Sequence, residues 1–280
     1  MLSYQHAYHA GNFADVHKHL TLYAVIDHLL RKDSAITYID THAGRGLYPL
    51  DAEETARLGE YRQGVARLWQ GRAGLAEDPL LGAWLAALAD VQAGSGLDRY
   101  PGSPWWLARR LRPQDRLRLF ELHPGEHGHL AGQELPENAR RIHGDGLAGL
   151  LKGLPVSTPR LCVLIDPSYE RKAEYGEVAE AVLQAMRKAR HALMLIWYPL
   201  LPAGRHRALL EGLRDGGLRK IWRSELTLAP PGEEDGMYGS GMLVVNPPWG
   251  LELRLEDAMA FVSPLLGEAC RHRGDWWVEE

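Results

Sequence analysis

The stretch from 161 to 169 reads L-C-V-L-I-D-P-S-Y and constrains the fold more than any other part of the chain. Its first five residues are apolar, and such a run ending at an acidic residue and a proline is typical of a strand buried on both faces. Strands of that kind form parallel sheets covered by helices, and ligands bind such sheets at the carboxyl ends of the strands. We therefore expect Asp166, Pro167, Ser168 and Tyr169 to lie at a ligand-binding edge.

Strand-like and helical segments alternate along the rest of the chain, which is the pattern of a doubly wound α/β fold. The expected strands cover residues 35–39, 117–120, 140–143, 161–165, 192–197, 218–228 and 241–245, the last two paired as a hairpin. The expected helices cover residues 15–31, 174–190, 202–215 and 256–269. These elements predict a Rossmann-like α/β fold with a seven-stranded, mostly parallel sheet, in a single domain spanning 1–280.

The distance between the first and second expected strands is unusually long. An acidic residue at the end of the second strand normally follows the glycine turn by about 20 residues, whereas Glu121 lies far beyond Gly46. Amphipathic helical patterns occupy 60–69 and 79–92 of the intervening stretch. We therefore predict a small helical insertion subdomain at 50–97.

Composition and charge favour a cytoplasmic enzyme. The chain has 280 residues, 45% of them hydrophobic, which suffices for one large core. The longest apolar run, 193–201, is too short to span a bilayer, and the amino terminus has no apolar signal region. Cys162 and Cys270 form no motif and suggest reduced thiols. A net charge of −4 disfavours a protein that coats nucleic acid, so contact with nucleic acid would need a local basic patch.

Three turns that follow expected strands carry residues suited to a nucleotide-like ligand. Gly44 and Gly46 let the backbone of the first turn approach a ligand closely. Glu121 ends the second strand, where its carboxylate could hold both hydroxyls of a ribose. Asp145 and Gly146 follow the third strand, where the carboxylate could accept from the amine of an adenine. Each turn alone is equally consistent with an ordinary turn or helix cap, but their order along successive strands indicates a cofactor site.

The tetrad from Asp166 to Tyr169 resembles the D/N-P-P-Y/F/W signature of amino-group methyltransferases that use S-adenosylmethionine (SAM), and the expected strands fit the methyltransferase variant of the fold. In that chemistry, Asp166 and the Pro167 carbonyl accept the two N–H groups of the target amine, and Tyr169 stacks on the extruded base. Ser168 stands where the signature usually has a second proline. The structural alternative is a turn that caps the next helix.

A second tetrad, Asn246-Pro247-Pro248-Trp249, matches the signature better and also follows an apolar stretch, 241–245. The strand before it is the seventh expected strand, which runs antiparallel in this fold. Its carboxyl end would then point away from the cofactor edge. We therefore predict a structural turn at Asn246 and keep Asp166 as the catalytic candidate.

The segment 1–19, M-L-S-Y-Q-H-A-Y-H-A-G-N-F-A-D-V-H-K-H, together with segments 40–46, 100–104, 121–124 and 196–199, closely resembles the RlmJ family over essentially the whole chain. That family comprises bacterial 23S ribosomal RNA adenine-N6 methyltransferases. The resemblance implies SAM as cofactor, 23S rRNA as partner and a monomeric protein. It implies cofactor contacts from His19, His42, Ser103, Glu121, Asp145, Gly146 and Asp166. It also implies a substrate role for Tyr4, with His6 and Lys18 nearby.

Several alternatives remain open at this point. The rings and cations of segment 1–19 suit RNA bases and phosphates, but the same aromatics could pack into the core. Four histidines there could suggest a metal site, yet no cysteine or carboxylate cluster completes one, so we predict none. The same tetrad chemistry is compatible with adenine methylation in DNA, with glutamine methylation in proteins, and with a catalytically silent nucleic-acid-binding protein. A local basic patch could come from segments 109–112, 140–141 or 205–207.

Overall fold

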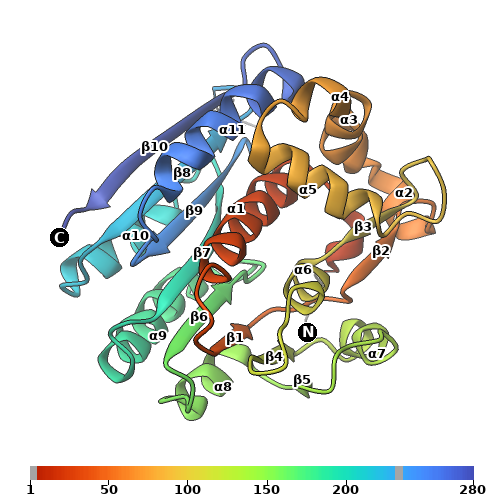
Figure 1. Ribbon diagram of the computed structural model, residues 1–280. Coiled ribbons are helices and arrows are strands. Elements are labelled where there is room, and N and C mark those ends of the chain that lie inside the picture. Colours follow the sequence, from red (N-terminus) through yellow and green to blue (C-terminus); the bar gives the residue numbers. More distant parts are fainter. Residues whose placement is uncertain (1–4, 231–235) are drawn as a thin grey trace.

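The computed structural model describes residues 5–230 and 236–280, and a mixed sheet forms its centre (Figure 1). The strand order is β10-β8-β9-β7-β6-β1-β4-β5. The parallel part consists of β1 (Ile36–Asp40), β4 (Arg116–Glu121), β5 (Ala139–His143), β6 (Arg160–Ile165) and β7 (Leu193–Leu200). The remaining strands pair in antiparallel fashion and are β8 (Ile221–Thr227), β9 (Gly239–Val245) and β10 (Arg271–Val278).

The predicted Rossmann-like α/β fold with a mostly parallel sheet is confirmed, with one correction to the sheet. The predicted strand at 241–245 corresponds to β9, which runs antiparallel between β7 and β8 as expected. The predicted count of seven strands is wrong, because the central sheet has eight. The additional strand, β10, reads R-H-R-G-D-W-W-V and lies at the edge of the sheet. An edge strand need not be apolar along its length, so no apolar run marks it in the sequence.

Helices cover both faces of the sheet (Figure 1). On one face lie α1 (Phe13–Leu29), α6 (Ser103–Arg109) and α11 (Leu251–Leu266), and on the other lie α8 (Gly146–Gly153), α9 (Glu174–Lys188) and α10 (His206–Asp215). Alternate residues of β6 belong to two separate apolar clusters, with Leu164 on the α1 side and Val163 on the α9 side. Burial on both sides explains the unbroken apolar run at this strand.

The stretch predicted as an insertion, 50–97, lies between two short paired strands, β2 (Leu47–Pro49) and β3 (Arg99–Pro101). It contains α2 (Glu53–Leu58), η2 (Glu60–Gln63), α3 (Val65–Gln70), α4 (Arg72–Leu75) and α5 (Pro79–Ala89). Leu81, Trp84 and Leu88 of α5 are buried in the same apolar cluster as α1. These helices therefore extend the main core over α1.

Helix α1 is buried along most of its length. Every residue from 13 to 26 is buried, although Asp15, His17, Lys18 and His19 are polar or ionisable. Buried ionisable groups are costly unless they are paired, so such a group of side chains on one helix indicates a functional site. None of the described helices is both long enough and apolar enough to cross a membrane. The remaining short helices are η1 (His6–Tyr8) and α7 (Pro124–Ala131).

Candidate active site

A cavity of about 740 Å³ opens at the carboxyl edge of the parallel strands, beside the first turns of α1. Side chains that follow β1, β4, β5 and β6 line it, as expected where parallel strands end together. The cavity brings together most of the predicted site residues: His6, Lys18, His19, His42, Ser103, Glu121, Asp145, Gly146, Asp166, Pro167 and Tyr169. Tyr4, the other predicted substrate residue, lies outside the described residues.

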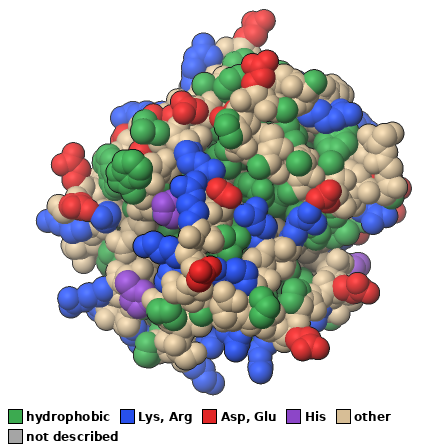
Figure 2. Space-filling model, viewed as in Figure 1, with side chains coloured by type: hydrophobic (Ala, Val, Ile, Leu, Met, Phe, Trp, Pro, Cys, Tyr) green, Lys and Arg blue, Asp and Glu red, His purple; other side chains and the backbone are tan. Residues whose placement is uncertain are grey.

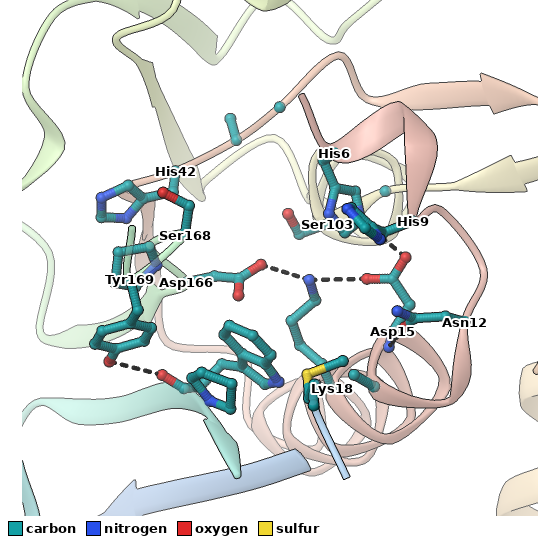
Figure 3. Close-up of a pocket in the computed structure, with 18 of the residues that line it drawn as sticks. His6, His9, Asn12, Asp15, Lys18, His42, Ser103, Asp166, Ser168 and Tyr169 are labelled. Carbon is teal, nitrogen blue, oxygen red and sulfur yellow. Dashed lines mark hydrogen bonds and ion pairs between the residues drawn. The ribbon is translucent and has the colours of Figure 1, made fainter. Parts of the chain in front are cut away.

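Two carboxylates share one ammonium group in the middle of the cavity (Figure 3). Lys18 Nζ donates to Asp166 Oδ2 and lies 2.9 Å from Asp15 Oδ1. The side chains of Lys18 and Asp15 are almost completely buried, and that of Asp166 is 13% exposed. With all three groups ionised, this cluster carries a net negative charge inside a poorly solvated space.

The surroundings shift the pKa values of all three groups. Burial raises the pKa of Asp166, and the nearby Lys18 ammonium partly opposes that rise. Burial would also raise the pKa of Asp15, but the charges of His6 and Lys18 outweigh it and hold the pKa well below the usual range. For Lys18, burial acts to lower the pKa, whereas the two carboxylates raise it and keep the ammonium charged.

Asp15 is held in place by the amino-terminal segment. Its Oδ2 accepts hydrogen bonds from Gly11 N and from His6 Nε2, each at 2.8 Å. Asn12 caps α1 by accepting from Asp15 N at 3.0 Å. The sequence analysis missed Asp15 as a site residue, although its position three residues before Lys18 on a helix indicates a shared face.

Tyr169 is more enclosed than expected for a side chain that stacks on a base. It is only 4% exposed, and the Tyr175 ring stacks against it with centroids 4.2 Å apart. Its hydroxyl donates to the Trp197 carbonyl at 2.9 Å, and its backbone has a φ of +52°. The ring still lines the cavity. Tyr169 therefore has a fixed orientation, with Tyr175 as its stacking partner.

Trp197 is a cavity residue that the sequence analysis also missed. Its ring centroid lies 6.1 Å from that of Tyr169 and 5.9 Å from Lys18 Nζ. Trp197 belongs to β7, which is parallel to β6 and adjacent to it. Its position in the strand next to β6 could have indicated a site residue, because the carboxyl ends of neighbouring parallel strands meet at the same edge of the sheet.

The predicted cofactor turns are joined by Glu121. Its carboxylate accepts from Gly44 N at 2.8 Å and from His123 N at 2.7 Å, while burial raises its pKa. Gly44 has a φ of +62°, which favours glycine. At Gly146, a Cβ atom would lie 1.9 Å from the Thr41 carbonyl oxygen, so only glycine fits between the two turns. Glu121 and Gly146 thus shape the loops that line the cavity.

The predicted cofactor residues leave polar atoms available to a ligand. Burial lowers the pKa of His19 well below its usual value, and its Nδ1 pairs with the Tyr100 hydroxyl at 2.7 Å. Its Nε2 is buried without a hydrogen-bond partner among the described residues, which suits a polar ligand in the cavity. Burial also lowers the pKa of His42 to about 4. Asp145 caps α8 by accepting from Ala148 N at 3.0 Å.

Comparison with known proteins identifies the family. The family model described as "Ribosomal RNA large subunit methyltransferase D, RlmJ" matches residues 33–279. The chain belongs to the RlmJ family. Proteins named "Ribosomal RNA large subunit methyltransferase J" from Escherichia coli (strain K12) and Haemophilus influenzae are each 36% identical to it. The alignments cover 99% of both the chain and the Escherichia coli protein, and 100% of the chain and 98% of the Haemophilus influenzae protein.

A solved structure agrees with the assignment to the RlmJ family. A Legionella pneumophila protein of known crystal structure is 33% identical to this chain, with a TM-score of 0.89. The superposition covers 96% of this chain and 98% of that one. The similarity therefore extends over nearly the whole chain and is not limited to the central sheet.

The second tetrad of this RlmJ family member lies at the opposite edge of the sheet. Val245, at the end of β9, pairs with Met194, near the start of β7. The next residue, Asn246, donates its side-chain N–H groups to the carbonyls of Arg190 and Ala192 at 3.0 and 2.9 Å. Asn246 therefore closes a turn at the amino-terminal edge, away from the cavity.

The basic segments named in the sequence analysis do not line the cavity. Figure 2 shows Lys and Arg side chains near the middle of one face of the molecule, with acidic side chains between them. Arg109 pairs with Asp90, and Arg110 pairs with Asp27. Arg112 makes a partly buried ion pair with Asp115 at 2.8 Å. The 109–112 segment is thus largely neutralised by neighbouring carboxylates.

Proposed function

We propose that the protein transfers a methyl group from SAM to N6 of one adenine in 23S rRNA. Membership of the RlmJ family supports a methyltransferase that acts on large-subunit ribosomal RNA. The observation that carries the finer proposal is the buried Asp166 carboxylate, which lines the same cavity as the glycine turn and Tyr169. A carboxylate and a free proline carbonyl at one turn are suited to an exocyclic amine.

The residues present fit the cofactor. When bound, SAM supplies an electrophilic methyl group on a cationic sulfonium. The Asp166 carboxylate in the cavity favours a cation, and His19 Nε2, which is buried without a hydrogen-bond partner among the described residues, can meet one of its polar groups. The residues that would hold it are His19, His42, Ser103, Glu121, Asp145, Gly146 and Asp166.

The residues of the tetrad orient the amine of the target base for attack on the methyl group. The lone pair of an adenine amine is delocalised into the ring, so attack requires the nitrogen to become partly pyramidal. Asp166 accepts one N–H and the Pro167 carbonyl accepts the other, which directs the lone pair toward the methyl group. Tyr169 lies beside the extruded base, and Asp166 takes the proton once the nitrogen has become cationic.

Lys18 has two roles in this mechanism. It opposes the burial that raises the pKa of Asp166, so more of the carboxylate stays ionised and able to accept. It also occupies Asp166 Oδ2, one of the two oxygens available to the incoming amine. Because Asp15 already binds the same ammonium, Lys18 can give up Asp166 without losing its only partner.

The decisive test is to incubate purified protein and SAM carrying a labelled methyl group with unmodified 23S rRNA, and then to digest the RNA to nucleosides. We expect labelled N6-methyladenosine at a single position, and little or no label with the Asp166→Ala variant, which has no acceptor at this place. Adenine-containing DNA is assayed in parallel. Label in DNA or in protein, or an unlabelled rRNA, would contradict the proposal.

A further inference from the structure

A second set of buried polar side chains links α1 to the antiparallel strands and reaches the cavity wall at Trp197. Trp197 Nε1 donates to Ser240 Oγ at 3.0 Å, and Ser240 Oγ lies 3.0 Å from His17 Nδ1. On the other side of the same ring, His17 Nε2 lies 2.8 Å from Ser224 Oγ, which lies 2.7 Å from His272 Nε2. His17, Ser224 and Ser240 are completely buried.

Only the first bond of this hydrogen-bonded chain has a direction fixed by its donor. An indole N–H can only donate, so Ser240 Oγ accepts from Trp197, and we assign the hydroxyl proton of Ser240 to His17 Nδ1. A neutral His17 then carries its proton on Nε2 and donates it to Ser224 Oγ. Ser224 in turn donates to His272 Nε2, so each group accepts one hydrogen bond and donates the next.

Burial determines the charge of the two histidines. Burial lowers the pKa of His17 to about 3 and that of His272 to about 4, so both rings are neutral at physiological pH. A neutral imidazole has one donor and one acceptor, which is what the chain requires of His17. Fully satisfied polar networks inside a core hold their members in one arrangement.

The first member of this hydrogen-bonded series, Trp197, lies among the groups assigned to the target base. The Trp197 ring lies beside Lys18 and Tyr169, and its own carbonyl accepts from the Tyr169 hydroxyl. Its side chain is thus held by Ser240, and its backbone is held by Tyr169 of the tetrad. Without a partner for the indole N–H, the ring would lose one of these restraints.

We propose that Trp197 forms a second wall of the target-base site and that the Ser240–His17–Ser224 chain is a positioning device that sets its indole orientation. This inference rests on the proposed adenine methylation. It gives His17, and His272 of the edge strand β10, a role in positioning Trp197, although neither histidine lines the cavity.

Kinetics with unmodified 23S rRNA test the proposal. We expect Trp197→Ala to lower kcat/KM for RNA by about 5- to 150-fold, the range of base-stacking losses. Trp197→Phe and Ser240→Ala should each lower it by about five-fold, because each removes the same hydrogen bond. The double variant should be no worse than either single variant, since the shared interaction is lost only once. SAM binding, measured by calorimetry, should stay unchanged in all of them.

The matched control is Ser263→Ala, which removes another buried serine hydroxyl, on α11 and outside the chain. Its kcat/KM should equal that of the unaltered protein. Full activity of Trp197→Ala would overturn the proposal, and so would additive losses in the double variant. A Ser240→Ala variant as active as Ser263→Ala would also overturn it.

Nuclear magnetic resonance of 15N-labelled protein tests the chain without any activity. We expect His17 to be a neutral ring protonated on Nε2 down to pH 5, and the Trp197 indole N–H signal to move in Ser240→Ala. A His17 proton on Nδ1 would overturn the proposed direction. If the unaltered protein failed to methylate RNA, the proposed function would fall, whereas these spectra would still decide whether the chain exists.

Discussion

Two tetrads with similar residues follow buried strands in this protein, and they lie at opposite edges of the same sheet. Asp166 follows β6, which is parallel to its neighbours, and Asn246 follows β9, which is antiparallel to its neighbours. Each tetrad has a non-glycine residue in the left-handed region, Tyr169 at +52° in one and Asn246 at +53° in the other. The left-handed residue is the last of one tetrad and the first of the other, so its presence alone does not tell which tetrad lines the cavity.

The two tetrads differ in the surroundings of their first residues, Asp166 and Asn246. The carboxylate of Asp166 faces a cavity and a buried ammonium, whereas the amide of Asn246 is used up by two backbone carbonyls. The aromatic residues differ in the same way, because Tyr169 is buried and Trp249 is 91% exposed. The comparison shows that strand direction, more than similarity to a signature, decides which tetrad lies at the cavity.

The largest expected effect comes from removing the first residue of each tetrad. Asp166→Ala should lower methyl transfer by about 10²- to 10⁴-fold or abolish it, because acceptor and proton-accepting group are lost together. Asn246→Ala should keep measurable activity while lowering the free energy of unfolding by about 1–3 kcal/mol, because two backbone carbonyls lose their partner. Labelled-methyl assays and urea unfolding measure both effects. The reverse pattern of activity would overturn the choice of tetrad.

A second prediction compares the lysines close to the two tetrads. Lys18→Met removes the charge that opposes the raised pKa of Asp166, so this pKa should rise further. The acidic limb of the kcat/KM profile should then move up by about 1–3 pH units, the usual effect of a close opposite charge. Lys220→Met is the control, because Lys220 lies at the other edge, where its carbonyl accepts from Asn246 N. If the acidic limb of the pH profile did not move in Lys18→Met, Lys18 would not have the proposed effect on the pKa of Asp166.

A third prediction concerns the acids at the two ends of β1. Burial raises the pKa of Asp40, at the carboxyl end, to about 7, so the folded protein binds a proton that the unfolded chain releases above about pH 4. Stability should therefore fall as pH rises from about 4 to about 7, and Asp40→Asn should remove that slope. Asp33, exposed before the start of β1, provides the control Asp33→Asn. Urea unfolding across this pH range measures the effect. If the free energy of unfolding of Asp40→Asn depended on pH as it does in the unaltered protein, the interpretation would be wrong.

The smallest expected effects involve the aromatic residues. Tyr169→Phe keeps the ring but removes the hydrogen bond to the Trp197 carbonyl, which should cost about 0.5–1.5 kcal/mol of unfolding free energy. Trp249→Ala removes an exposed side chain and should change stability by less than about 0.5 kcal/mol. Thermal unfolding compares the two. Equal losses would mean that the hydrogen bond from the Tyr169 hydroxyl to the Trp197 carbonyl contributes nothing to stability.

The sequence predicted well those parts of the molecule whose residues are buried on both sides. The apolar run before Asp166 corresponds to β6, and the antiparallel direction expected for the strand at 241–245 is confirmed. The edge strand β10 could not be predicted, because an exposed edge imposes no apolar pattern. The ends of the expected helices also differ, since α10 begins at His206 rather than at 202. Capping and turn residues shift such boundaries by several positions.

The site was only partly predictable for a related reason. Residues that end strands could be placed from strand order, which is why Glu121 and Asp166 lie where they were expected. Asp15 and Trp197 were missed because their importance depends on which neighbours they meet. The stacking of Tyr175 on Tyr169 likewise joins the tetrad to a helix, a contact that no local pattern describes.

The amino-acid sequence by itself determined the alternation of strands and helices, and with it the edge of the sheet at which Asp166 lies. Apolar periodicity and turn residues act over a few positions, so they are visible in the chain. Only the tertiary structure decided that Lys18 from α1 lies between Asp15 and Asp166, and that Ser240 holds Trp197 from a strand far along the chain. Such contacts depend on how helices pack on the sheet, and this depends on the whole core at once.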